Sequence, residues 1–486
     1  MKLRNAVVGV GLLTAAWCAA AAPARATFGS RTAADEPQYL LSALSLWEDG
    51  DLAIDDELAA ERWRDFHEAA LPEQTRPLDD GRRLSPHDPL LAVVLAAPVG
   101  LGGWLGAKLA MAAMAGLLAA VLVWVAVRRF TVPVAVAGLT VLAFSLAAPL
   151  VVYGAQIYPE LPAALVVTIA IAALTGPLRR RGLAVLWLAV VVLPWLSVKY
   201  APVAAGLALI GFVMLVRRGR WRAAVVGAAI LAGAGLAYVG FHRAVYGGWT
   251  VYAAGDHFVG GELTAAGSSP NYGGRSVRLV GLLTDRVFGL LAWAPGWLLA
   301  VPAVAAVLRR RPHGWAAIVV PAAVGWLVAT FVALTMHGYW WPGRQVVVIL
   351  PALVLATAWW LATATGRWPR AALVGAAAVG VATWAWLLVE LWAGRLAVIF
   401  GFELTGNPWY RVWHVVLPDY RRLTSADWVL HGAWILAIGL LVVAGWRSLS
   451  IRSAPMMKET STDDHPMGPA GGRRDAGDLV GSVGVR

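Results

Sequence analysis

Residues 103–149 read GWLGAKLAMAAMAGLLAAVLVWVAVRRFTVPVAVAGLTVLAFSLAAP, in which two apolar stretches, 103–127 and 131–149, flank the basic pair Arg128-Arg129. Roughly 20 consecutive apolar residues are needed to cross a bilayer. Each stretch is therefore predicted to form a transmembrane helix. Short loops rich in Arg and Lys stay on the cytoplasmic side of a membrane, so we expect the loop between the two helices on that side.

The same alternation continues along the 486-residue chain, which is 59% hydrophobic and only 14% charged. Soluble domains carry about 25% charged residues, so this composition excludes a single large water-soluble body. The further predicted spans lie near residues 160–177, 183–197, 201–216, 223–241, 291–308, 316–335, 345–363, 371–392 and 428–446. With the first apolar segment, Ala6–Ala22, they give about twelve spans. We therefore predict an all-α, polytopic helical bundle in the plasma membrane.

The net charge of +12 arises largely from basic runs between the apolar stretches. Because these runs are all expected on one side of the membrane, they indicate topology and not nucleic-acid binding. The predicted partner is the lipid bilayer. Cys18 is the only cysteine, which excludes a disulfide framework and a thiolate metal cluster.

The pattern divides the chain into four parts. These are a first transmembrane segment at residues 1–22, an acidic extracytoplasmic loop with juxtamembrane helices at 23–88, a multi-pass region at 89–450 and a disordered cytoplasmic tail at 451–486. The first segment is expected to stay as a signal anchor, because this gives an even number of spans and an internal C-terminus. The alternative is cleavage after the small-x-small sequence Ala24-Arg25-Ala26.

Two adjacent carboxylates, Asp35 and Glu36, open a predicted helix, Asp35–Trp47, in the acidic loop. A positioned carboxylate can take the proton of an attacking hydroxyl group, and two acids together can hold a divalent cation through oxygen ligands. The alternative is a purely structural role, in which Asp35 caps the helix and Gln38 completes a capping box. The sequence leaves both roles open.

Further polar residues gather at the predicted outer face. His87 and Asp88 lie where the chain re-enters the membrane, and they either face the carboxylates or belong to an interfacial turn. Lys199 can bind a lipid phosphate or extend to the headgroups. Arg344 suits phosphate oxygens through its planar fork, and Trp340 either stacks on a sugar or joins the interfacial aromatic belt.

The remaining candidates lie in other outer segments. Tyr158, Glu160 and His337 lie in predicted outer turns and are candidates for the same cavity. Asp285-Arg286 is a charged pair in an apolar stretch, expected to neutralise itself. Weaker candidates in a Gly-rich outer loop are Asp256, His257 and Glu262.

In several motifs the chain resembles the C-type (GT-C) membrane glycosyltransferases. The matching pieces, in order, are Asp35–Leu40 (DEPQYL), Ser85–Pro89 (SPHDP), Tyr158–Pro162 (YPELP), Trp195–Tyr200, Leu282–Pro295 and Gly338–Arg344. The resemblance implies a GT-C-like bundle that transfers a sugar, with inversion, from a polyprenyl-phosphate donor to an extracytoplasmic glycan, lipid or protein. No tightly bound cofactor is implied, although a divalent cation can take part.

The resemblance also implies roles for single residues. Asp35 would be the general base, with Glu36 assisting it or holding a metal, and Lys199 and Arg344 would contact the donor phosphate. One departure concerns Asp88, which stands where many relatives have the first of two prolines and puts the role of the preceding histidine in doubt.

Two other function classes compete with this one. A transporter or flippase of envelope precursors is expected to carry mid-membrane ionisable residues and repeated halves, whereas the predicted spans look almost free of charge and show no repeat. A non-catalytic envelope assembly protein would keep the fold and tolerate the loss of Asp35.

Overall fold

The computed structural model describes residues 2–256, 262, 267 and 269–448, and these residues contain helices and no β-strand. The first helices are α1 (Leu3–Ala19), α2 (Glu36–Glu48), α3 (Asp55–Ala59), α4 (Leu90–Phe130), α5 (Val134–Ser145), α6 (Leu150–Tyr153), α7 (Glu160–Leu174), α8 (Arg180–Leu196), α9 (Ala201–Arg217) and α10 (Trp221–Tyr246). The later helices are α11 (Tyr272–Arg275), α12 (Arg278–Thr284), α13 (Leu290–Trp293), α14 (Ala300–Arg310), α15 (Trp315–Leu327), α16 (Leu350–Thr363), α17 (Trp368–Trp392), α18 (Pro408–Trp413) and α19 (Ser425–Arg447). The predicted all-α class is confirmed.

Within the described residues, seven helical segments are long and apolar enough to cross a membrane. They are Leu90–Phe130, Val198–Arg217, Trp221–Ala254, Trp315–Val332, Arg344–Thr363, Trp368–Trp392 and Ser425–Arg447. Three shorter apolar helices, α1, α5 and α7, accompany them. The count of about twelve spans is therefore not confirmed. One reason is that the predicted span 291–308 is broken, since α13 ends at Trp293 and a 3₁₀ turn separates it from α14.

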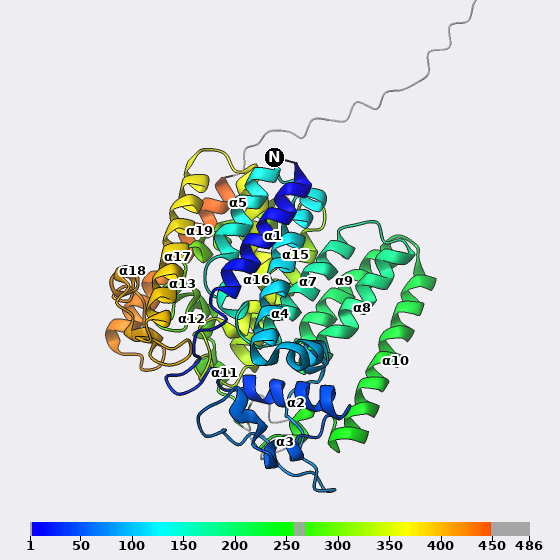
Figure 1. Cartoon of the computed structure of the whole chain (residues 1–486). Coiled ribbons are helices and arrows are strands. Elements are labelled where there is room, and N and C mark those ends of the chain that lie inside the picture. Colours follow the sequence, from blue (N-terminus) through cyan, green and yellow to red (C-terminus); the bar gives the residue numbers. More distant parts are fainter. Residues whose placement is uncertain (1, 257–261, 263–266, 268, 449–486) are drawn as a thin grey trace, which may run out of the picture. The chain divides into compact units, whose positions relative to one another are not determined.

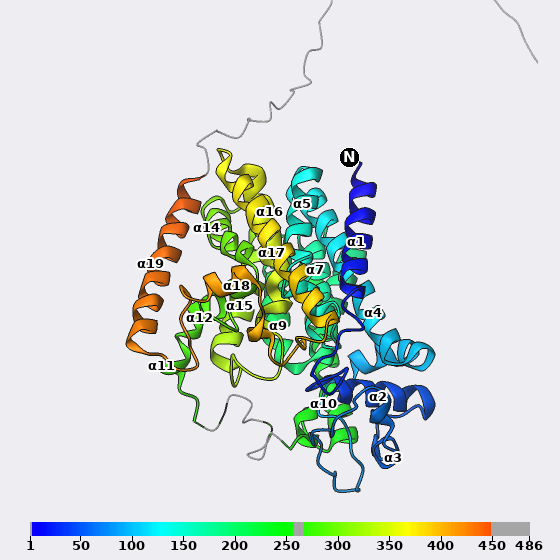
Figure 2. The ribbon, with the colours of Figure 1, turned by 60° about the vertical axis from the view of Figure 1, so that its left-hand side comes forward.

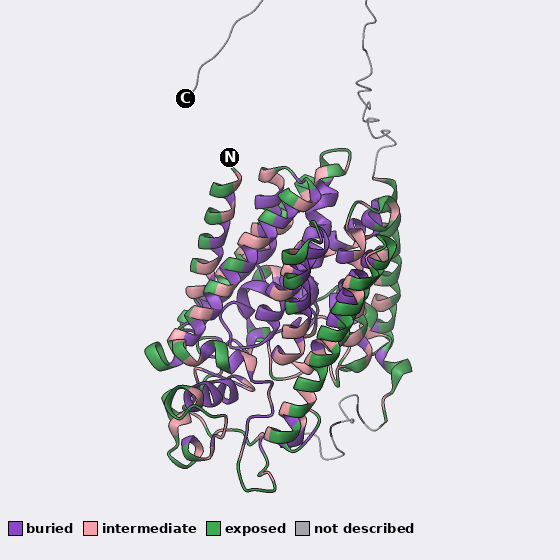
Figure 3. Ribbon diagram, turned by 90° about the vertical axis from the view of Figure 1, so that its right-hand side faces the viewer, coloured by how far each residue is buried: buried purple, intermediate pink, exposed green. Residues whose placement is uncertain are grey.

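The long helix α4 bends at Gly103, whose φ of 59° and ψ of −152° interrupt the helical backbone. The predicted span 103–127 thus begins at the bend. Buried residues concentrate in the central helices, whereas peripheral ones such as α10 and α19 are largely exposed (Figure 3). In a membrane protein such an apolar exposed face is suited to contact with lipid.

Helices α1 and α4 pack closely through small residues. A Cβ atom on Gly116 would lie 2.6 Å from the carbonyl oxygen of Gly11 and 2.8 Å from Cβ of Ala15. Small residues let the backbones of membrane helices approach each other, and much of the association energy comes from this packing.

Gly116→Val is therefore expected to destabilise the protein by about 1–3 kcal/mol, because the added side chain forces α1 and α4 apart. The matched control is Gly9→Val on α1, where a Cβ would meet no described atom within 4 Å. Thermal unfolding of both variants in detergent measures the difference. Equal melting temperatures would show that this helix contact contributes little.

The predicted loop 23–88 contains α2, which lies across one end of the helical bundle, while the N-terminus of α1 lies at the other end (Figure 1, Figure 2). The predicted helix Asp35–Trp47 is confirmed as Glu36–Glu48. Ten consecutive residues of α2, from Glu36 to Ser45, are buried, so the helix is an integral part of the fold. The predicted tail, residues 451–486, lies outside the described residues.

Candidate active site

Four charged side chains from distant parts of the chain meet beside α2. Arg344 donates from Nη2 to Oδ2 of Asp35 at 2.5 Å and from Nε to Oε1 of Glu160 at 2.7 Å. Lys199 Nζ donates to the same Glu160 oxygen at 2.6 Å. The structure thus brings Asp35, Lys199 and Arg344 together and adds Glu160 as the acceptor that joins the two cations.

Each of the four residues lies where a helix begins or breaks. Asp35 immediately precedes α2 and Glu160 is the first residue of α7. Lys199 lies in the 3₁₀ turn between α8 and α9, and Arg344 begins another such turn after Gly343, whose φ of +83° favours glycine. Non-helical backbone at membrane depth is tolerated where it is buried in protein or lines a cavity, so these breaks can bring charged groups to one place.

A cavity of about 230 Å³ lies beside this network and is lined by Asp35, Lys199 and Arg344. The other lining residues are Tyr39, Gln74, Pro86, His87, Asp88, Ser197, Val251, Tyr252, Gly255 and Leu334. They come from α2, the loop before α4, the α8–α9 turn and the segments after α10 and α15. Clefts with a few convergent polar groups are the usual setting of binding and active sites.

The local geometry excludes one of the two roles weighed for Asp35, that of a helix cap. Within the described structure its side chain caps no helical N–H group, so the capping box with Gln38 is wrong. Burial opposes the charge of Asp35, but the charges of Arg344 and Lys199 and the hydrogen bond from Arg344 more than offset this and hold the pKa of the carboxyl well below its usual range. Asp35 is therefore an ionised carboxylate facing the cavity.

Glu36 faces away from its neighbour. Its two carboxylate oxygens accept hydrogen bonds from the backbone N–H groups of Ala33 and Ile157, each at 3.0 Å. Burial raises the pKa of Glu36, and these two bonds and the charge of Lys108 oppose the increase. Since Asp35 and Glu36 turn to different partners, the arrangement does not favour a shared cation, and Glu36 instead ties the start of α2 to the segment before α7.

His87 and Asp88 both line the cavity. The His87 ring stacks on Tyr39 with ring centroids 4.6 Å apart, and its Nε2 lies 3.3 Å from Oε1 of Gln74. Burial lowers the pKa of His87, with the charge of Asp35 opposing this and those of Arg344 and Lys199 adding to it. A neutral His87 is therefore expected at pH 7.

Asp88 holds the turn that carries Lys199. Its carboxylate accepts hydrogen bonds from the backbone N–H of Val198 at 2.9 Å and from the hydroxyl group of Tyr238 at 2.7 Å. His242 Nε2 lies 3.5 Å from the same carboxylate. Asp88 thereby links the start of α4, the α8–α9 turn and α10.

Tyr158 and Trp340 flank the guanidinium of Arg344. Its Cζ lies 4.4 Å from the ring centroid of Tyr158 and 5.3 Å from that of Trp340. Aromatic faces attract cations at such distances. The two rings therefore help to fix the orientation of Arg344.

Asp285, Arg286 and His337 belong to a separate network. Asp285 accepts hydrogen bonds from the N–H of Tyr420 at 3.1 Å, and His337 Nε2 lies 3.1 Å from the same carboxylate. Arg286 pairs with Asp427 at 3.4 Å. The prediction that Asp285 and Arg286 neutralise each other is wrong, since each has another partner, and none of the three lines the cavity.

Of the weaker candidates in the Gly-rich loop, Glu262 is not among the residues that line the cavity. Glu262 accepts hydrogen bonds from the backbone N–H groups of Trp249 and Thr250, at 3.0 and 2.6 Å, and so organises its own loop. Asp256 N–H bonds to the Gln74 carbonyl, and His257 lies outside the described residues.

Sequence reasoning missed Lys108, which is buried within α4 and donates to the carbonyl oxygen of Arg31 at 3.1 Å. The sequence does mark this residue, because Lys108 is the only charged residue in the apolar stretch 103–127. The expectation that the spans carry almost no buried charge is therefore wrong for α4. Gln74, Tyr39 and Tyr252 were also missed as cavity residues, and no local motif marks them.

No protein-family model and no curated protein matches the chain. Among solved structures, ArnT from Cupriavidus metallidurans bound to undecaprenyl phosphate is similar with a TM-score of 0.53 and 17% identity, covering 90% of this chain and 73% of that chain. The apo state of the same protein gives a TM-score of 0.51 with the same identity and coverage. The chain has an ArnT-like fold. The predicted GT-C-like architecture is thus confirmed, and at this identity the likeness establishes the fold alone.

Proposed function

We propose that this GT-C protein transfers a sugar, with inversion, from a polyprenyl-phosphate donor to a hydroxyl group of a glycan, lipid or protein. The observation that carries the proposal is the convergence of Lys199, Arg344 and an ionised Asp35 on one cavity. The similar structure of ArnT with undecaprenyl phosphate supports a lipid-linked donor.

The two cations suit the donor phosphate. Lys199 and Arg344 are balanced by Asp35 and Glu160, so the network is close to neutral before a ligand arrives. A phosphodiester donor carries one negative charge, and the phosphate monoester that leaves carries up to two. Fixed cations that face this developing charge lower the barrier to departure. A donor phosphate would compete with Asp35 for the guanidinium of Arg344.

Asp35 is placed to act as the base. As the acceptor oxygen bonds to the anomeric carbon, its proton passes to the Asp35 carboxylate, and the bond from that carbon to the phosphate oxygen breaks with its electron pair leaving on the polyprenyl phosphate. While Arg344 is paired with Asp35, the carboxylate is a weak base. Engagement of Arg344 by the phosphate raises the proton affinity of Asp35 when it is needed.

We place the cavity on the extracytoplasmic side of the plasma membrane. Lys2 and Arg4 precede α1, and positive residues beside the first span favour a cytoplasmic N-terminus. The N-terminus of α1 and the helix α2 lie at opposite ends of the bundle (Figure 2). The side that carries Asp35 would then face outward.

The test is transfer by purified protein in lipid nanodiscs, with a panel of polyprenyl-phosphate sugars and a membrane extract as the source of acceptors. We expect transfer from at least one donor, and a roughly 10- to 100-fold weaker donor affinity in Lys199→Met because a charge-assisted phosphate contact is lost. Arg411→Met, which removes an exposed cation of α18 outside the cavity lining, is the control. The proposal fails if the wild type neither binds polyprenyl phosphate nor transfers any sugar, and movement of a lipid-linked precursor across vesicles would then favour a flippase.

A further inference from the structure

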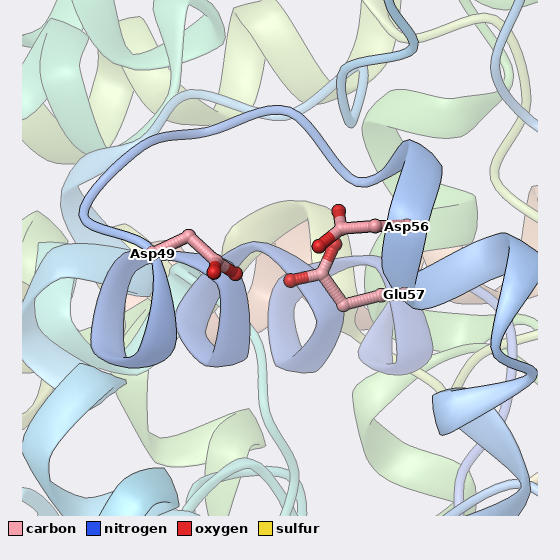
Figure 4. Close-up of side chains that lie close together, drawn as sticks. All are labelled: Asp49, Asp56 and Glu57. Carbon is pink, nitrogen blue, oxygen red and sulfur yellow. The ribbon is translucent and has the colours of Figure 1, made fainter.

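A second group of carboxylates lies at the opposite end of α2 from Asp35. Asp49 follows the last residue of α2, and Asp56 and Glu57 lie on α3. One oxygen from each of the three carboxylates lies within 4.8 Å of the other two. Figure 4 shows the three side chains directed from two helices toward a common space.

Glu57 distinguishes this group from an ordinary acidic surface. The residue is only 2% exposed, and neither of its carboxylate oxygens is paired with a hydrogen-bond donor that the structure describes. A buried carboxylate without a donor carries its full desolvation cost. Burial and the neighbouring Asp56 raise the pKa of Glu57 to about 8, which reflects the same cost.

Other acids of the same stretch have partners. Glu48 pairs with Arg62 through two hydrogen bonds of 2.7 and 2.8 Å. Asp51 accepts the N–H of Ala53 at 2.8 Å, and Asp55 accepts the N–H of Arg83 at 2.9 Å. These three hydrogen-bond donors, the Arg62 side chain and the N–H groups of Ala53 and Arg83, are thus directed to acids other than Glu57.

We propose that Asp49, Asp56 and Glu57 bind a calcium ion. Three carboxylates offer up to six oxygen ligands, and calcium takes six to eight oxygens in flexible geometry, whereas magnesium demands a near-ideal octahedron. Asp49 and Asp56 are exposed, which leaves room for water ligands. Zinc prefers nitrogen and sulfur ligands, and the group holds neither.

A bound calcium ion would join the C-terminal end of α2 to α3 and close the turn between them. Asp35 begins the same α2 helix, so this clamp would fix the helix that delivers the cavity carboxylate. The inference does not rest on the glycosyltransferase proposal, because it concerns binding and stability and not transfer.

The experiment uses the full-length protein in nanodiscs, stripped with a chelator and titrated with calcium chloride by calorimetry and thermal unfolding. We expect saturable binding with a dissociation constant on the order of 10⁻⁴–10⁻³ M, as in other extracellular calcium modules, and a higher melting temperature. Glu57→Gln should weaken binding at least tenfold, and so should Asp56→Asn, which changes an exposed residue and spares the core. Glu61→Gln, at an exposed carboxylate paired with Arg64, is the matched control.

The melting temperature gives a second test, because the difference between Glu57→Gln and the wild type should change sign when calcium is added. In chelator at pH 9, where Glu57 is mostly ionised, Glu57→Gln should unfold at a higher temperature than the wild type, because it removes a buried negative charge; in calcium the order should reverse. A variant that is less stable than the wild type under both conditions would indicate a purely structural carboxylate and overturn the proposal. Absence of calcium binding by the wild type would overturn it too, and equal binding of magnesium would overturn the choice of ion.

Discussion

Asp35→Asn is expected to lower the rate of sugar transfer by a factor of about 10²–10⁴, the usual contribution of a positioned general base. The substitution keeps the size of the side chain and removes its ability to accept a proton. It also removes the carboxylate that holds Arg344 Nη2 at 2.5 Å. Binding of polyprenyl phosphate should therefore stay intact or become tighter, because the phosphate no longer competes with Asp35 for the guanidinium.

The test is specific because Asp35→Asn should lower the rate of sugar transfer without weakening the binding of polyprenyl phosphate. Single-turnover transfer and equilibrium binding of polyprenyl phosphate are measured on the same preparation. Asp65→Asn, at an exposed carboxylate of the same loop with 76% of its side chain accessible, should change neither. Transfer at the wild-type rate by Asp35→Asn would remove Asp35 as the base. A parallel loss of transfer and binding would instead assign Asp35 a structural role.

The meeting of Asp35, Lys199 and Arg344 could be predicted because ionisable residues near membrane depth are costly and must find partners. The resemblance of their local motifs to those of GT-C proteins favours the same expectation. The pairing itself could not be predicted. The contact of Arg344 with both Asp35 and Glu160 depends on how α7 packs against the turn before α16, and no periodicity in the sequence reports that packing.

Other predictions from the sequence were wrong for similar reasons. Adjacency in the sequence favours a shared role for Glu36 and Asp35, but consecutive residues at a helix start point in different directions. The span count failed where apolar composition continues through broken helices, as between α13 and α14. Composition reports where the chain avoids water, whereas the break between Trp293 and Ala300 depends on tertiary contacts such as the bond from Trp297 Nε1 to the carbonyl of Ala148 at 2.9 Å.

Arg344→Gln is expected to give the largest loss of stability among the site variants. Arg344 and Glu160 have side chains that are only 10% and 1% exposed, and the arginine also binds Asp35. Removal of one partner of a buried ion pair costs about 3–5 kcal/mol. Without Arg344, Asp35 and Glu160 would be left with Lys199 as the one cation of the four-residue network. Thermal and denaturant unfolding in detergent measure this loss, and transfer should fall together with stability.

The double variant Arg344→Gln/Glu160→Gln separates stability from function. It leaves Lys199 to balance Asp35, so most of the lost stability should return, while transfer should stay low because the phosphate still lacks the guanidinium. A double-mutant cycle over the four proteins gives the coupling energy of the pair. The same cycle on the exposed pair Arg64–Glu61 should show little coupling, since solvent screens exposed ion pairs. If the coupling between Arg344 and Glu160 were equally small, the buried network would not hold the site together, and the competition between Asp35 and phosphate for Arg344 would lose its physical basis.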